Sequence, residues 1–244
     1  MRKEIMVVGD VHGFWGALNH LLNKKRPKMV LQCGDFGWWP RHRTPARKAD
    51  GMRISGFEPF GVKHSNSEIY FCPGNHEDWD ELSLRHADFS QVMPNVWYAK
   101  QGAHFTLSDG RVVLFLGGAA SIDKDSRTIG YDWFPQEQLP LSVLYKLEES
   151  GLKSADIVIS HTCPQEFNPF LNKKRPYNGW EYKFYDSSQE VLSEVLYMYK
   201  PMLWYFGHFH VEMCGFHRET GTKWYALNDI PNSGWWRYLS DYGT

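Results

Sequence analysis

The chain has 244 residues, of which 42% are hydrophobic and 23% are charged, which is ordinary for a folded protein with a sizeable core. Its 27 basic and 28 acidic residues leave a net charge of −1, which excludes an overall field that draws the protein to nucleic acid or to an anionic membrane. Four scattered cysteines and no apolar run of membrane-spanning length predict a reduced, cytoplasmic protein with no membrane partner. We expect one domain over residues 1–244.

Short apolar runs rich in β-branched residues recur along the chain and predict strands that are buried on both faces. These runs cover residues 4–8, 29–33, 68–72, 112–116, 156–160 and 202–206. Apolar residues with helical spacing alternate with them and predict helices over residues 14–24 and 188–199. This alternation is typical of an α/β protein.

Turn signals and one irregular segment complete the predicted architecture. Asp109-Gly110 and Thr220-Gly221 each separate two strand-like segments and predict hairpins. A parallel-rich core with such antiparallel extensions favours two mixed β-sheets flanked by helices. Residues 117–136 have no clean periodicity and precede a helix that we expect to begin near Pro135. Irregular insertions of this length are often functional loops.

Side chains that can bind a metal follow five of the six predicted strands. They are Asp10 and His12, Asp35, Asn75, His161, and His208 with His210. Singly, such an Asp is more often a turn or helix-cap residue, and such a His is more often a satisfied core group. Ser, Thr or Gly would serve as turn residues equally well, so the joint occurrence predicts one site. In open α/β sheets, ligand crevices form at the carboxyl ends of the strands.

The number and type of these side chains indicate the kind of metal site. Seven candidate ligands are too many for one tetrahedral ion, and two ions that share Asp35 fit the count. Nitrogen and oxygen donors without a thiolate favour Mn, Fe, Zn or Ni, and the oxygens are too few for calcium. We therefore expect two divalent metal ions, with Mn²⁺ preferred.

The motifs GDVHG, GDFG, GNHE, SHT and GHFH, in this order, resemble those of the calcineurin-like metallophosphoesterases. The resemblance spans Asp10 to His210 and implies a four-layer αββα sandwich with a dinuclear metal site. In this family, such a site hydrolyses phosphomonoesters or phosphodiesters with a bridging hydroxide as nucleophile. Transferred by motif, one metal is held by Asp10, His12, Asp35 and His210, and the other by Asp35, Asn75, His161 and His208. The resemblance makes Asp35 and His76 the catalytic residues, with His76 protonating the leaving alkoxide.

The sequence departs from the protein phosphatase branch of this family. That branch has an Asp-Arg pair after the second motif and an Arg before GNHE, where this chain has Trp38, Trp39 and Pro73. These departures argue against a phosphoprotein substrate and leave open which group orients His76, with Glu77 or another carboxylate as candidates.

Replacement phosphate contacts are expected from the irregular segment. Its candidates are Ser121, Asp123, Lys124 and Arg127, and the alternative is a solvent-facing charged turn. With Lys124 and Arg127, we expect Asn75 and His76 to contact the substrate.

The substrate class stays open between several alternatives. A nucleotide or another small phosphorylated molecule is the first hypothesis. A nuclease or cyclic phosphodiesterase is the second, with the basic runs 24–28, 41–48 and 172–176 and the paired Trp38 and Trp39 forming a groove. With this pair, Trp133 is a candidate to stack a base or nucleoside. Packing is the other explanation of these tryptophans. A protein phosphatase or a metal-bearing scaffold without catalysis is a further alternative, and the oligomeric state is not determined.

Overall fold

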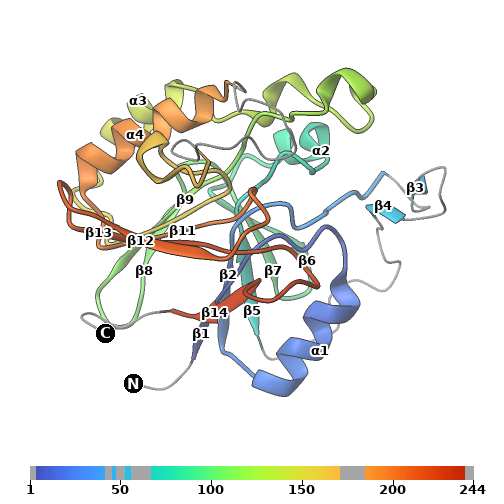
Figure 1. Ribbon diagram of the computed structural model, residues 1–244, viewed down its shortest axis with the longest axis horizontal. Coiled ribbons are helices and arrows are strands. Elements are labelled where there is room, and N and C mark those ends of the chain that lie inside the picture. The colour runs from blue at the N-terminus through green and yellow to red at the C-terminus, as the bar shows by residue number, and fades with distance from the viewer. Residues whose placement is uncertain (1–3, 42–45, 48–52, 56–66, 171–184, 240–244) are drawn as a thin grey trace.

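The computed structural model describes residues 4–41, 46–47, 53–55, 67–170 and 185–239. Two six-stranded mixed sheets and a two-stranded ribbon hold its strands (Figure 1). The first sheet has the order β14 (Trp236–Tyr238), β1 (Ile5–Val8), β2 (Met29–Gln32), β5 (Glu68–Phe71), β7 (Val96–Ala99), β6 (Phe89–Met93). The second has the order β12 (Met213–His217), β13 (Thr222–Ala226), β11 (Leu203–Phe206), β10 (Ile157–Ser160), β9 (Val112–Leu116), β8 (His104–Thr106). The ribbon pairs β3 (Ala46–Arg47) with β4 (Arg53–Ser55).

Helices cover the outer face of each sheet. Helix α1 (Trp15–Lys25) packs its buried apolar residues on the first sheet, and α3 (Ser142–Glu149) and α4 (Ser187–Tyr199) pack on the second. Asp186 caps α4 by accepting a hydrogen bond from the Ser188 amide, which satisfies one free donor of the first turn. Short helical segments occupy the connections: α2 (Trp79–Ser83), η1 (Lys124–Ser126), η2 (Pro135–Glu137) and η3 (Gln165–Phe167).

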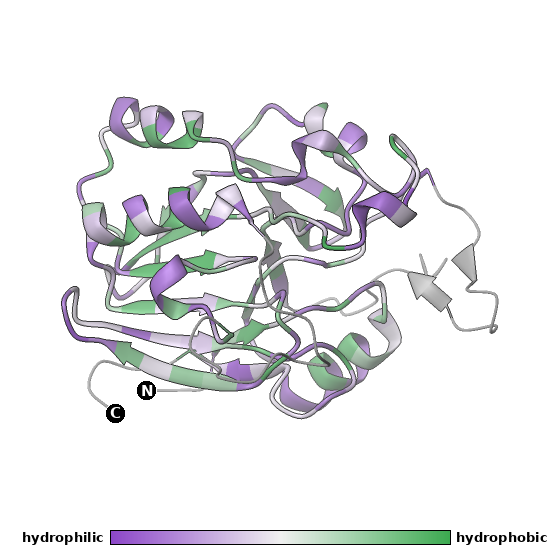
Figure 2. Cartoon of the chain, turned by 45° about the horizontal axis from the view of Figure 1, so that its top comes forward, coloured by the Kyte–Doolittle hydropathy of each residue, from purple (hydrophilic) through white to green (hydrophobic). Residues whose placement is uncertain are grey.

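A third apolar core lies between the two sheets. Successive strand residues face opposite sides, so Met6 and Val8 contact the α1 layer while Val7 faces the other sheet. Val7 shares the inner core with Tyr205 of β11, and both side chains are fully buried. The order of layers is therefore helix, sheet, sheet, helix, and Figure 2 places most of the hydrophobic colour on the strands and on the inward faces of the helices. This confirms the predicted αββα sandwich, while one domain over residues 1–244 stays a prediction.

Most predicted elements are observed within a residue or two of the expected bounds. The hairpins at Asp109-Gly110 and Thr220-Gly221 are present as antiparallel β8–β9 and β12–β13. The helix expected near Pro135 is wrong, because only the 3-10 turn η2 forms there and α3 begins at Ser142. The hairpin β6–β7 and the edge strand β14 were not predicted.

Strand direction brings the polar strand ends together. In the first sheet β1, β2 and β5 are parallel neighbours, and in the second β9, β10 and β11 are. Because parallel strands end at the same edge of a sheet, their carboxyl ends gather at one edge of the sandwich. All four cysteines are free, and within the described residues no helix is long and apolar enough to cross a membrane. Localisation in the cytoplasm stays a prediction.

Candidate metal centre

The backbone at the strand ends is bent into an uncommon conformation. His12, Asp35, His208 and His210 have positive φ angles of 48°, 51°, 64° and 49°. Residues other than glycine rarely adopt this left-handed region, and such residues concentrate at functional sites where surrounding contacts hold them. The bends turn the chain sharply after β1, β2 and β11.

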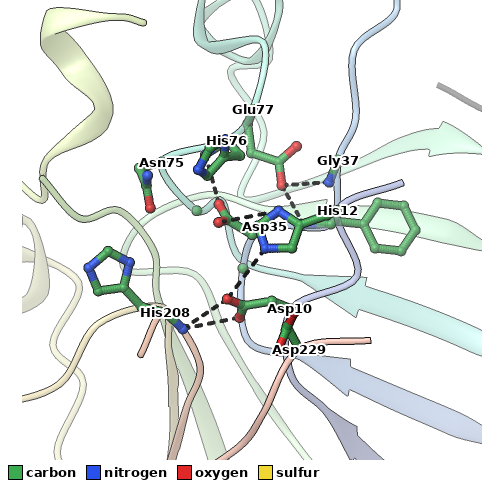
Figure 3. A network of polar contacts seen from close by, with 12 residues as sticks. Asp10, His12, Asp35, Gly37, Asn75, His76, Glu77, His208 and Asp229 are labelled. Carbon is green, nitrogen blue, oxygen red and sulfur yellow. Dashed lines mark hydrogen bonds and ion pairs between the residues drawn. The ribbon is translucent and has the colours of Figure 1, made fainter. Parts of the chain in front are cut away.

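Two motif glycines permit close approach of the buried carboxylates. A Cβ atom on Gly74 would lie 2.0 Å from Asp35 Oδ1, and one on Gly207 would lie 2.0 Å from Asp10 Oδ1. Because the chain comes so close at these glycines, backbone amides just after them can bind the carboxylates. The His76 amide donates to Asp35 Oδ1 at 2.7 Å, and the His208 amide donates to both oxygens of Asp10 at 3.1 Å (Figure 3). Each acid is thereby fixed by a strand end other than its own.

A first group of ligand atoms joins Asp10, His12 and His210, whose atoms lie within 4.8 Å of one another. His210 Nε2 lies 3.1 Å from Asp10 Oδ2 and 3.2 Å from His12 Nε2. Although burial opposes it, contact with Asp10 raises the pKa of His210 to about 9. Burial acts to raise the pKa of Asp10, but the hydrogen bond from His210 and the nearby His161 hold it below its usual value. The carboxylate therefore stabilises positive charge in this group.

A second group surrounds His161, which is fully buried. His161 Nδ1 donates to the carbonyl of Cys33 at 2.9 Å, so a neutral imidazole has its lone pair on Nε2. That Nε2 lies 2.9 Å from Asn75 Oδ1 and 3.4 Å from Asp35 Oδ1. In that neutral tautomer, a ring lone pair, an amide oxygen and a carboxylate oxygen converge. These three ligand atoms, one nitrogen and two oxygens, fit a divalent cation of the kind that binds nitrogen and oxygen ligands.

Asp35 lies between the two groups. Its Oδ1 faces His161, and its Oδ2 lies 3.7 Å from His12 Nδ1. Burial acts to raise the pKa of Asp35, but His161, His76 and His12 lower it far below its usual value. A carboxylate that stays ionised between two ligand groups is suited to bridge two cations.

His208 completes the gathering of the predicted ligands. Its ring lies edge-on to the His161 ring with centroids 4.9 Å apart, and burial lowers its pKa to about 3. It lines a cavity of about 440 Å³ together with Asp35, Asn75, His76 and Arg127. The structure therefore brings all seven predicted ligands into one site, while their roles as ligands stay predictions.

His76 contacts a cation from the irregular segment. Arg127 Nη2 donates to His76 Nε2 at 2.7 Å, and Arg127 also pairs with Asp123 at 2.7 Å. Burial lowers the pKa of His76 to about 4, with His12 and Arg127 acting in the same direction. The group against His76 Nε2 is therefore an arginine.

Glu77 has a different partner from the one expected. Its carboxylate accepts from the amides of Phe36, Gly37 and Trp38 at 2.7, 3.3 and 2.7 Å (Figure 3 labels Gly37). The hypothesis that Glu77 orients His76 is wrong, because both carboxylate oxygens are bound by the loop after Asp35. Glu77 instead holds that loop in place.

Other expectations for the site have mixed outcomes. Trp38 and Trp39 are each 3% exposed and belong to apolar clusters, which supports packing over base stacking. Lys124 is exposed and does not line the cavity, so its substrate contact stays a prediction. The basic run 172–176 lies outside the described residues, as does most of the run 41–48.

Two acids near the site were not predicted from the sequence. Asp229, after β13, has its Oδ2 3.9 Å from His210 Nδ1. Glu137 of η2 is buried and binds Ser121, which in turn contacts Asn75. Glu137 follows no strand end, whereas Asp229 comes three residues after β13, where the predicted hairpin at Thr220-Gly221 could have indicated it.

Comparisons with known proteins agree with this fold and this site. The model of the calcineurin-like phosphoesterase family matches residues 3–212, so the chain belongs to that family of phosphoester hydrolases. The chain is 26% identical over 247 residues to the lariat debranching enzyme of Gallus gallus, with 90% of this chain aligned. It spans only 45% of the length of that relative.

Solved structures resemble the fold at low sequence identity. The protein TT1561 of Thermus thermophilus has a TM-score of 0.52 and 13% identity, covering 92% of this chain and 88% of its own. Another solved structure has a TM-score of 0.54 and 12% identity, covering 94% and 92%. At these identities the likeness extends to the fold alone.

Proposed function

We propose that the protein is a metal-dependent hydrolase of phosphate esters whose substrate is a nucleotide or another small phosphorylated molecule. The observation that carries this proposal is the convergence of potential metal-ligand atoms from five strand ends, with Asp35 among them and Asn75 supplying the amide oxygen. The family supports the reaction class, and the cavity of about 440 Å³ has the size of a small-ligand site.

Two divalent cations, Mn²⁺ by preference, would be held on either side of Asp35. Asp10, His12 and His210 would complete one ligand set, and Asn75, His161 and His208 the other. Bound divalent cations supply positive charge for the phosphoryl oxygens and lower the pKa of a coordinated water.

The chain's own residues would position and protonate the substrate. The Arg127 guanidinium lines the cavity with a side chain only 7% exposed, where it can bind a non-bridging phosphate oxygen. His76 lines the same cavity, and once Arg127 turns from His76 Nε2 to the phosphate, that nitrogen can take up a proton and pass it to the leaving oxygen as the ester P–O bond breaks. The oxygen of the attacking water forms the new P–O bond, and the protons of that water pass to solvent or to the product.

A substrate panel tests the proposal. Wild type and Asp35→Asn are compared in Mn²⁺ buffer on an aryl phosphate, a bis-aryl phosphate, cyclic nucleotides, dinucleoside polyphosphates and a phosphopeptide. We expect wild type to hydrolyse at least one small ester and Asp35→Asn to hydrolyse none above background. Equal rates for the two proteins would refute catalysis at this site.

Hydrolysis of a nucleic acid phosphodiester is a second candidate, supported by the similarity to the lariat debranching enzyme over 90% of this chain. Binding of a polynucleotide releases counterions, so its affinity falls steeply with salt. We expect a small substrate to show little change in KM between about 50 and 200 mM salt. A fall of about a thousandfold in the affinity for single-stranded RNA over the same range of salt would favour the nuclease.

A further inference from the structure

A chain of two hydrogen bonds, from Asn75 to Ser121 and from Ser121 to Glu137, leads away from Asn75 into the protein. Asn75 Nδ2 donates to Ser121 Oγ at 3.0 Å, and Ser121 Oγ donates to Glu137 Oε2 at 2.9 Å. The other carboxylate oxygen, Oε1, accepts from the Ser121 amide at 2.6 Å and from Trp133 Nε1 at 3.0 Å. Ser121 and Glu137 are each 1% exposed, so water does not compete for these bonds.

The direction of this chain is set at Glu137. An ionised carboxylate only accepts hydrogen bonds, so the single hydroxyl proton of Ser121 points to Glu137. Toward Asn75, Ser121 Oγ can then only accept a hydrogen bond. Since the NH₂ group is the only donor of the Asn75 side chain, that group must face Ser121. The amide oxygen must consequently face His161 and Asp35, where it lies 2.9 Å from His161 Nε2.

The orientation of Asn75 matters because its two ends are opposite in chemistry. The amide oxygen can bind a cation, whereas the NH₂ group can only donate and would repel one. We propose that Ser121 and Glu137 are positioning residues that hold the oxygen of Asn75 toward the metal centre. This inference rests on the proposed function, and it gives Ser121 a role other than contact with the substrate phosphate.

The variant Glu137→Gln reverses the chain with little change in shape. Oε1 receives two N–H donors, so the oxygen of the new amide takes that position and its NH₂ faces Ser121 Oγ. The hydroxyl of Ser121 then accepts from residue 137 and donates to Asn75. Asn75 would turn its oxygen to Ser121 and its NH₂ to the metal centre.

The test is Mn²⁺ binding measured by calorimetry at about pH 8, without substrate. We expect Glu137→Gln to weaken one Mn²⁺ site about 10–100-fold, as is typical when a partner behind a metal ligand is lost. Trp133→Phe is the matched control, because it removes a hydrogen bond to the same carboxylate without reversing the chain. It should stay within about threefold of wild type in Mn²⁺ affinity.

The background Asn75→Asp separates orientation from packing. Aspartate has two equivalent oxygens, so no flip can remove the ligand atom. In that background, Glu137→Gln lets Ser121 donate to the new carboxylate at position 75, and we expect Mn²⁺ affinity to be unchanged or higher. An equal loss in both backgrounds would overturn the proposal, since it would indicate a structural role alone.

Circular dichroism checks that each variant is folded. The variant Ser121→Ala removes the same chain of hydrogen bonds in a second, independent way. Unchanged Mn²⁺ binding in both Glu137→Gln and Ser121→Ala would overturn the proposal and leave the proposed function standing. A wild type that binds two Mn²⁺ and hydrolyses no phosphate ester would defeat the function and leave the inference intact. A wild type that binds no Mn²⁺ would overturn both.

Discussion

The buried carboxylate of Glu137 makes stability depend on pH in a way that can be calculated. Burial raises its pKa to about 7 from the ordinary 4.5, although hydrogen bonds from Ser121 and Trp133 oppose the rise. Because the folded state holds this proton more tightly than the unfolded state, ionisation on raising the pH costs the folded state free energy. The cost begins near pH 4.5, is complete above pH 7, and reaches about 3 kcal/mol.

Glu137→Gln removes this cost because glutamine does not titrate. Between about pH 5 and pH 8.5, we expect the free energy of unfolding of Glu137→Gln to rise relative to wild type by about 2.5 kcal/mol. Urea unfolding in EDTA at five pH values measures the difference, and other titrating groups cancel in it. Glu149→Gln, at the exposed end of α3, is the control and should show no trend. A flat difference for Glu137→Gln would refute the reasoning.

Three further variants test separate parts of the site. His76→Gln should lower kcat about 10²–10⁴-fold with the Mn²⁺ content unchanged by elemental analysis, and loss of the metal would contradict its role as a proton donor. Arg127→Met should raise KM about 10–100-fold in steady-state assays, since it removes a charged hydrogen bond to phosphate, and an unchanged KM would place the phosphate elsewhere. Gly74→Ala places a Cβ 2.0 Å from Asp35 Oδ1 and should lower the free energy of unfolding by about 1–3 kcal/mol in urea. Unchanged stability would show that the loop relaxes freely.

Much of the site follows from patterns that are local in the sequence. A buried strand is a short apolar run, and the residue after it lies at the sheet edge whatever the rest of the chain does. This is why Asp10, Asp35 and His161 could be expected in one place before the structure was known. Parallel strand direction, which the alternation of strands and helices already indicates, gathers the strand ends within each sheet, and the packing of the two sheets brings both sets together.

The supporting contacts could not be predicted, because they depend on packing between distant segments. Ser121 lies in the segment 117–136, which has no periodicity, and Glu137 follows 16 residues later, so only the folded path of the chain between them brings their side chains together. Glu77 stands beside His76 in the sequence, yet its carboxylate turns to the amides after β2. The left-handed backbone conformation of Asp35 could not be predicted either, because among residue types it is glycine that indicates such a conformation.

The most direct test of the metal centre is anomalous diffraction from crystals soaked in Mn²⁺. We expect two peaks, about 3.5–4 Å apart, on either side of the Asp35 carboxylate, one beside His12 and His210 and the other beside His161 and Asn75. No peak, or a single peak that does not contact Asp35, would contradict the proposal that these side chains bind a pair of cations.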